Sequence, residues 1–222
     1  MKSLNPKEII RPAAVLVIIC IVIAALLAGT NELTKEPIAE QTQLQAQQAR
    51  EIVLPQASRF EPVPADAVQS LGLPDGCYFA LDKDNRVIGV TITTAAKGYG
   101  GDITVIVGID STQDSVSGVS ILSQDETPGL GSNATNAEFT DQYKQPLPQN
   151  GFSVIKNAQP KDGEIAAITG ATITSDAVTA AVNEALSVYN NTLKKYDVSL
   201  GLWEDVLSAI QAKPDSSKGG AD

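Results

Sequence analysis

The feature that most limits how this chain can fold is an uncharged run of 17 residues, 13–29, close to its start. The run reads AAVLVIICIVIAALLAG, and as an α-helix it measures about 25 Å at 1.5 Å per residue. That length approaches the roughly 30 Å thickness of the hydrocarbon core of a bilayer. With one flanking residue added, the pattern predicts a single transmembrane helix over residues 13–30.

Basic residues before the run predict the orientation of this helix. Residues 1–12 hold three basic residues against one acidic residue, and positively charged flanks stay in the cytoplasm. A cleaved signal peptide also has a basic start, but its apolar core is usually about 7–15 residues long, and ALLAG at 25–29 is a poor cleavage site. We therefore favour an uncleaved anchor, with the residues after it outside the cytoplasm.

The composition excludes several kinds of chemistry. The chain has no histidine, which rules out zinc, haem and Ser-His-Asp sites that depend on this residue. Cys20 and Cys77 are too few for a four-thiolate metal or iron–sulfur site, and they give no internal disulfide framework. The net charge of −10 argues against nucleic-acid binding, which needs a basic surface.

The residues after the anchor predict a helical stalk and a β-rich domain. A loose apolar stripe over 31–53 predicts a helix, and four prolines make 55–76 a loop-rich linker. Alternating apolar residues then predict an antiparallel meander with one face on a core and the other face polar. The strands predicted for the meander are 77–81, 86–94, 103–109 and 116–122, and further strands are predicted at 152–156 and 164–168.

Helical spacing returns later in the chain. A short helix is predicted near 136–143, and a longer one from Ser175 to Tyr189, with Thr174 or Ser175 as its N-cap. A last short helix is expected over 203–212. Together these elements predict an α+β fold, an antiparallel sheet packed by helices. The expected parts are a cytoplasmic N-terminus (1–12), the transmembrane helix (13–30), a juxtamembrane helix and linker (31–76), the domain (77–195) and a C-terminal extension (196–222).

The junction at residues 167–175, AITGATITS, is the clearest candidate site. A strand ends there and a helix begins, so hydroxyl groups gather beside the unpaired amides of a helix N-terminus, which is a favourable place for a phosphate. An ordinary helix cap explains the same residues, and they alone favour the cap. The hydroxyl residues are Thr169, Thr172, Thr174 and Ser175.

Two glycine-rich loops precede this junction. In DETPGLG at 125–131, the Pro-Gly pair predicts a turn, and Glu126 and Thr127 put an acceptor and a hydroxyl at the mouth of the loop. In GYGG at 98–101, Tyr99 is the single aromatic residue, and the loop lacks the lysine and spacing of a P-loop. Each loop alone indicates only a bend in the chain.

An anchor followed by GYGG, ETPGLG and TGATITS, in this order, resembles the G subunit of the Rnf ion-translocating electron-transport complex (RnfG, also called RsxG). It is also similar to the related C subunit of the sodium-pumping NADH:quinone oxidoreductase (NqrC). The resemblance covers about residues 5–195. It implies a single-pass protein of the bacterial cytoplasmic membrane, with an FMN-binding domain on the extracytoplasmic side.

The resemblance also implies roles for individual residues. FMN is expected to be covalent, held by a phosphoester between its phosphate and the hydroxyl of Thr172, which a separate flavin transferase forms. Ala166 stands where the pattern read by the transferase often has Asp. The residues expected to shape the recognition element and the helix start are Thr169, Gly170, Ala171, Thr174 and Ser175. The residues expected in the flavin pocket are Tyr99, Glu126, Thr127, Gly129, Leu130 and Gly131.

On this interpretation the chain relays electrons within a ferredoxin:NAD⁺ oxidoreductase of the Rnf type. Its implied partners are multi-span membrane subunits, iron–sulfur and flavin subunits, and the flavin transferase. The chain itself is expected to bind no nicotinamide and to catalyse nothing alone. The other interpretation is a membrane-anchored binding or sensor module outside the cytoplasm, in which TGAT is only a helix cap.

Overall fold

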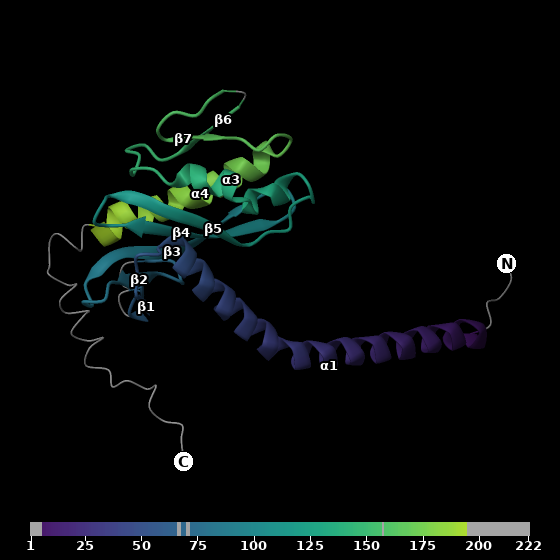
Figure 1. The fold of residues 1–222 in the computed structure, drawn as a ribbon. Coiled ribbons are helices and arrows are strands. Elements are labelled where there is room, and N and C mark those ends of the chain that lie inside the picture. The colour runs from purple at the N-terminus through teal and green to yellow at the C-terminus, as the bar shows by residue number, and fades with distance from the viewer. Residues whose placement is uncertain (1–5, 66–67, 70–71, 157, 195–222) are drawn as a thin grey trace, which may run out of the picture. The chain divides into compact units, whose positions relative to one another are not determined.

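A computed structural model describes residues 6–65, 68–69, 72–156 and 158–194. They form two compact units, which divide between Gln45 and Ala46, and Figure 1 shows their helices and strands. The helix predicted over 203–212, like the rest of the C-terminal extension, lies outside the described residues.

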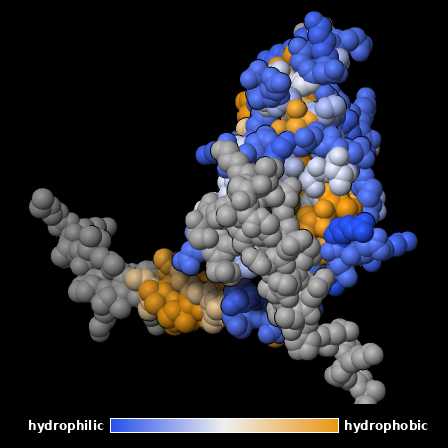
Figure 2. All heavy atoms as spheres, turned by 90° about the vertical axis from the view of Figure 1, so that its left-hand side faces the viewer, coloured by the Kyte–Doolittle hydropathy of each residue, from blue (hydrophilic) through white to orange (hydrophobic). Residues whose placement is uncertain are grey.

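Helix α1, Pro6–Val53, is continuous where two helices were expected. Hydroxyl groups of Thr30, Thr34 and Thr42 donate to carbonyl oxygens one turn earlier, so these polar residues fit within the helix. Among the described residues, α1 contains the one stretch that is long and apolar enough to cross a membrane. Its large apolar side chains are exposed, and in the view of Figure 2 they gather along this helix while the surface of the domain is mostly hydrophilic.

The second unit is built on a five-stranded antiparallel meander in the order β1-β2-β3-β4-β5. Alternation predicted four of these strands correctly, but it did not predict β1, which lies in the segment expected to be a loop-rich linker. Its short sequence RFEP has no alternation, and it pairs only at the sheet edge, where its final Pro62 is tolerated. The strands are β1 Arg59–Pro62, β2 Tyr78–Leu81, β3 Val87–Lys97, β4 Asp102–Asp110 and β5 Ser115–Ser123.

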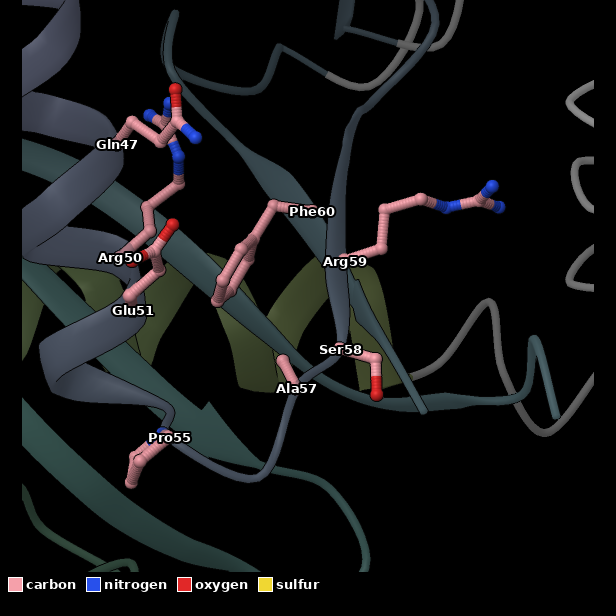
Figure 3. A pocket seen from close by; sticks show the side chains of 8 residues that line it. All are labelled: Gln47, Arg50, Glu51, Pro55, Ala57, Ser58, Arg59 and Phe60. Carbon is pink, nitrogen blue, oxygen red and sulfur yellow. The ribbon is translucent and has the colours of Figure 1, made fainter. Parts of the chain in front are cut away.

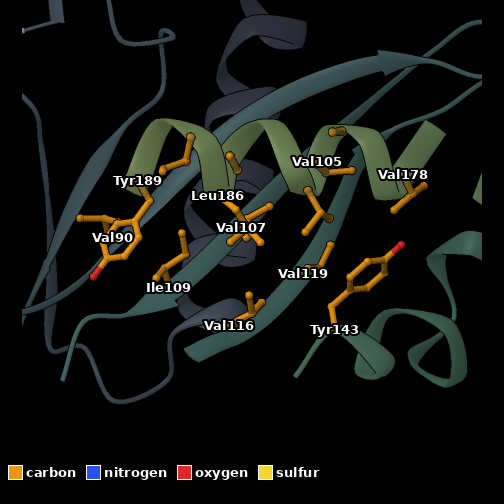
Figure 4. Close-up of a cluster of buried hydrophobic side chains, with 14 of the residues drawn as sticks. Val90, Val105, Val107, Ile109, Val116, Val119, Tyr143, Val178, Leu186 and Tyr189 are labelled. Carbon is orange, nitrogen blue, oxygen red and sulfur yellow. The ribbon is translucent and has the colours of Figure 1, made fainter. Parts of the chain in front are cut away.

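Helix α4, Thr172–Val188, covers one face of this sheet and continues into η3, Tyr189–Leu193. Its predicted apolar stripe is buried against β3 and β4, as Figure 4 shows for Val178, Leu186 and the strand residues below them. The hydroxyl of Thr94 on β3 also donates to the carbonyl oxygen of Ala181 at 2.8 Å. This packing fixes the start of α4 relative to the sheet.

The opposite face of the sheet carries the end of α1. Ala49 and Val53 pack on Ile106 in a second, smaller core, so the expectation that this face is polar was wrong here. The strand residues nearest to the end of α1 form one row of residues paired in register across the sheet. Their side chains become smaller toward β5, which lets the helix approach the backbone of β4 and β5. The row is Tyr78, Thr91, Gly108 and Gly118.

Arg50, on the last turn of α1, contacts Tyr78 at the β2 end of this row. Its guanidinium carbon lies 3.9 Å from the ring centroid of Tyr78, an attractive cation–π geometry. A pocket of about 560 Å³ opens between this turn and β1 (Figure 3). It contains none of the residues predicted to bind the flavin, and its lining is Gln47, Arg50, Glu51, Pro55, Ala57, Ser58, Arg59 and Phe60.

Short elements between β5 and α4 lead the chain to the start of α4. The predicted helix near 136–143 is present as α3, Ala137–Thr140, and the 3₁₀ turn η2, Asp141–Tyr143, which follow the 3₁₀ turn η1, Gly131–Thr135. Strands β6, Ser153–Ile155, and β7, Glu164–Ala166, form a separate parallel pair. The side chain of Gln142 accepts a 2.7 Å hydrogen bond from the amide of Ala166, which fixes the strand that leads into α4.

Candidate functional site

Three segments that are far apart in the sequence meet at the carboxylate of Glu126. The amide of Gly100 donates to Oε1 at 2.9 Å, and the hydroxyl of Thr174 donates to Oε2 at 2.5 Å. The amide of Tyr99 is a further donor to this carboxylate. We call Glu126, Tyr99, Gly100 and Thr174 the Glu126 cluster. It joins the β3–β4 turn, the loop after β5 and the first turn of α4.

Glu126 is an ionised side chain in the interior of the domain. It is only 6 % exposed, whereas the sequence placed it at the mouth of a loop. Burial alone raises the pKa of a carboxyl, but the hydrogen bonds from Thr174, Gly100 and Tyr99 outweigh burial and hold the pKa of Glu126 below its ordinary value. The cluster is therefore built around a buried negative charge.

At two positions beside the Glu126 carboxylate, the carboxylate oxygens lie so close to the backbone that only glycine fits. A Cβ on Gly98 would lie 2.4 Å from Oε1 of Glu126, and one on Gly131 would lie 2.5 Å from Oε2. Gly131 is thus a packed position. Gly129 has a φ of +76°, and no atom of the described residues lies within 4 Å of its Cβ position, so there the predicted turn conformation is the reason for glycine.

The chain enters α4 through a tight turn. The amide of Ala171 donates to the carbonyl oxygen of Ile168 at 3.0 Å, and Gly170 between them has a φ of +78°. The hydroxyl of Ser175 accepts from the amide of Ile168 and donates to the carbonyl oxygen of Ala171. These bonds hold the turn against the helix.

Among the residues that the structure describes, no side chain caps the N-terminus of α4. The helix begins at Thr172 with Ala171 as N-cap, so the expectation of a cap at Thr174 or Ser175 was wrong, because both hydroxyls are committed to the bonds described above. Within the described part of the chain, the amides of Thr172, Ile173 and Thr174 find no hydrogen-bond acceptor. The half-buried hydroxyl of Thr172 likewise has no partner there. This end of α4 therefore offers three free donors and a free hydroxyl to an anion.

Exposed apolar side chains surround this helix start. Outside α1, the large hydrophobic side chains that are exposed among the described residues are Tyr99 (72 %), Leu130 (44 %) and Ile173 (56 %). We call them the apolar trio. Tyr99 belongs to the Glu126 cluster, and Ile173 directly precedes Thr174 of that cluster. Leu130 directly precedes Gly131, and its Cδ2 would lie 3.2 Å from a Cβ on Gly170. The three side chains thus belong to one region of the surface.

The structure brings together the residues that the sequence singled out. Glu126, Gly131, Thr174 and Ser175 are buried, Thr172 is half-buried, and Tyr99 and Leu130 are exposed at the surface. The other exposed members are Thr127, Gly129, Thr169 and Gly170, and Ala171 is buried. Sequence reasoning did not select Ile173; its position off the buried stripe of α4 was the available signal.

A polar cavity of about 380 Å³ borders the turn that precedes α4 on the side of α3 and η2. It reaches Thr169 at the edge of the candidate site, and side-chain amides supply most of its polar groups. The lining residues are Asn133, Asn136, Glu138, Phe139, Gln142, Ala166, Ala167, Ile168 and Thr169.

Comparison with known proteins places this chain in a family. Residues 98–187 match the model of an FMN-binding domain, and residues 1–52 match the model of the RnfG N-terminal region. The G subunit of the Na⁺-translocating ferredoxin:NAD⁺ oxidoreductase complex of Acetobacterium woodii is 35 % identical over 199 residues, which cover 85 % of this chain and 95 % of that protein. The chain belongs to the RnfG family.

A further relative agrees with this assignment. The G subunit of an ion-translocating oxidoreductase complex of Methanosarcina acetivorans is 37 % identical over 186 residues, 82 % of this RnfG-family chain and 95 % of that protein. Among solved structures, the C subunit of a Na⁺-translocating NADH-quinone reductase from Parabacteroides distasonis is 25 % identical, with a TM-score of 0.44 over 51 % of this chain and 59 % of that one.

The family assignment confirms the resemblance drawn from the motifs, and the α+β fold class is confirmed as well. The match to the FMN-binding domain begins at Gly98 and ends within α4. It therefore includes the Glu126 cluster, the apolar trio and the open N-terminus of α4. This RnfG-family chain carries an FMN-binding domain behind one helix that is long and apolar enough to span a membrane.

Proposed function

We propose that this chain is an electron-carrier subunit of an ion-translocating ferredoxin:NAD⁺ oxidoreductase, and that it carries FMN bound covalently to Thr172. The observation that carries the proposal is the uncapped start of α4. There the hydroxyl of Thr172 and the amides of Thr172, Ile173 and Thr174 are free of partners in the described residues. The complex is inferred from the relatives, which are named as its G subunit.

The residues at this place fit the two chemically different ends of FMN. The free amides and the positive end of the helix dipole would hold the phosphate of an ester on Oγ1 of Thr172. The left-handed Gly170 leaves the backbone open there. The apolar trio offers the neighbouring surface to an aromatic ring. We assign the same neighbourhood to the flavin pocket, with Thr127, Gly129 and Gly131 shaping the loop that carries Leu130.

Thr172 needs another enzyme to form this bond. The chain contains no histidine, and no side chain of the described residues hydrogen-bonds the Thr172 hydroxyl, so nothing in that part of the chain activates it as a nucleophile. A flavin transferase therefore supplies a flavin dinucleotide, whose phosphoanhydride bond breaks and releases a nucleoside monophosphate as the bond from Oγ1 to the flavin phosphate forms, and the base that takes the hydroxyl proton. The exposed turn at Thr169 and Gly170, with Ala171 after it, is the element that we expect this enzyme to recognise.

The bound flavin supplies one- and two-electron redox chemistry. The protein positions it: the Glu126 cluster fixes the three segments around the site, and the single helix α1 keeps the domain at a membrane. From the basic residues before the apolar run we infer that the N-terminus is cytoplasmic and the domain extracytoplasmic. The partners are then the other subunits of the complex, among them multi-span membrane subunits and iron–sulfur or flavin subunits.

The experiment is to produce the full chain together with a flavin transferase and to measure its intact mass and its flavin fluorescence on a denaturing gel. Wild type should gain the mass of one FMN less one water, mapped to the peptide that contains Thr172. Thr172→Ala should lose both signals, whereas the matched variant Thr172→Ser, which keeps a hydroxyl, should retain them. A wild-type protein of unshifted mass and without fluorescence would contradict the proposal.

A further inference from the structure

Each segment that carries a member of the apolar trio also carries an exposed aspartate. Asp102 follows Tyr99 by three residues, Asp125 precedes Leu130 by five, and Asp176 follows Ile173 by three, and all three aspartates are exposed. We call Asp102, Asp125 and Asp176 the aspartate set. Within residues 97–102, 124–132 and 169–176, the one basic residue is Lys97.

The aspartates lie close to one another and to the start of α4. A Cβ on Gly101, the neighbour of Asp102, would lie 3.6 Å from Oδ2 of Asp125, so these two positions are adjacent on the surface. Asp176 is in the second turn of α4, on the helix face of Thr172 and Ile173, because residues three and four apart are neighbours on a helix. The aspartate set therefore borders the surface where Thr172 and the apolar trio lie.

We propose that this surface docks a redox partner protein whose contact surface has an apolar centre bordered by lysine and arginine. The proposal rests on the proposed function, because a flavin on Thr172 is what the partner would reach. The charge of the surface selects this occupant. An anionic membrane surface is repelled by the aspartate set, and so is a second copy of this chain, which carries a net charge of −10.

The arrangement suits a contact that must form and separate in each cycle. Electron-transfer partners make small interfaces, in which complementary charges speed the encounter and set its orientation. The apolar trio lets the two surfaces exclude water near the flavin, while the exposed aspartates stay solvated when the partner leaves. Such a contact weakens as ionic strength rises, because salt screens exposed charges.

The experiment uses the whole membrane complex, isolated through a tag on this chain. A carbodiimide, which couples a carboxylate to a nearby lysine, is applied, and the coupled peptides are identified by mass spectrometry. The variant is the triple substitution Asp102→Asn, Asp125→Asn and Asp176→Asn. The matched control is Asp75→Asn, Asp84→Asn and Asp162→Asn, three aspartates that are exposed elsewhere in the domain. In each complex the covalent flavin and the salt dependence of electron transfer are also measured.

We expect wild type and the control to couple the aspartate set to lysines of another subunit, and their electron transfer to slow as salt is added. The triple variant should keep its flavin, lose these couplings and transfer electrons about tenfold more slowly at low salt, at the lower end of the range for electrostatic steering. Couplings that join only two copies of this chain, or electron transfer in the variant equal to wild type with the flavin retained, would overturn the inference. Wild-type complex without covalent flavin would instead overturn the proposed function.

Discussion

The hydroxyl of Thr174 donates a 2.5 Å hydrogen bond to the carboxylate of Glu126, 48 residues earlier in the chain. This bond joins the first turn of α4 to the loop after β5, and the second oxygen of the same carboxylate holds the β3–β4 turn through Gly100. The segments that approach Thr172 therefore share one buried anion. Their positions relative to one another depend on whether that anion is present.

The first prediction concerns the pH dependence of folding. Hydrogen bonds hold the pKa of Glu126 in the folded protein below its ordinary value of 4.5. Its contribution to the free energy of unfolding is thus fully present above that value and is lost as the pH falls through the lower pKa of the folded state. Glu126→Gln cannot titrate and cannot accept as an anion. It should lose about 1–3 kcal/mol at neutral pH, the usual effect of unmaking buried hydrogen bonds to a charged group.

The measurement is urea unfolding of the full chain in detergent, followed by circular dichroism from neutral pH downward. The free energy of unfolding of wild type should fall as the pH drops below about 4.5, and the curve of Glu126→Gln should be flatter over the same range. Glu138→Gln, at an exposed position on α3, retains the buried anion and should keep the steep fall. Parallel curves for wild type and Glu126→Gln would contradict this account of the cluster.

The second prediction compares alanine substitutions at the two glycines of the loop after β5. A Cβ on Gly131 would lie 2.5 Å from Oε2 of Glu126 and 2.6 Å from Oγ1 of Thr174, so Gly131→Ala must push the two groups apart. It should destabilise the domain by about 1–3 kcal/mol and flatten the pH dependence described for Glu126. Gly129→Ala meets no atom of the described part of the chain within 4 Å, so its cost comes from the positive φ, about 1–2 kcal/mol.

The same urea titrations decide between these two effects. In Gly129→Ala the free energy of unfolding should still fall as the pH drops below about 4.5, because the hydrogen bond between Thr174 and Glu126 remains in that variant. If both variants lost stability and both kept the fall, the close approach of Gly131 to the carboxylate would not matter for the cluster.

Local patterns in the sequence predicted most of the fold. Alternation located β2 to β5, and helical spacing located the buried stripe of α4, because each pattern follows from which face of one element meets the core. The start of α4 was misplaced for a reason that no local pattern contains. Thr174 and Ser175 have the chemistry of N-caps, but tertiary partners occupy their hydroxyls.

The candidate site was predictable as a set of motifs but not as an arrangement. GYGG, ETPGLG and TGATITS together identified the family, and the order of these motifs is visible in the sequence. That Glu126 lies beneath the site as a buried anion follows only from contacts across 26 and 48 residues. The packing of the end of α1 on the sheet could not be predicted for a related reason. It takes place at the paired Gly108 and Gly118, and because glycine has no side chain, these positions add nothing to a hydrophobic pattern.

The third prediction tests that packing. A Cβ on Gly108 would lie 2.5 Å from the carbonyl oxygen of Val53 and 2.9 Å from its side chain, so Gly108→Ala should displace the last turn of α1 and cost about 1–3 kcal/mol. Val53→Ala, at a position with 0 % exposure, should cost roughly 1–3 kcal/mol because it empties part of the small core.

Since the nearest obstacle to the new Cβ is the backbone of Val53 rather than its side chain, the double variant should be at least as unstable as Gly108→Ala alone. Urea unfolding of the three variants measures this. Recovery of wild-type stability in the double variant would show that the helix end is held by the Val53 side chain and not by the approach of its backbone to the paired glycines.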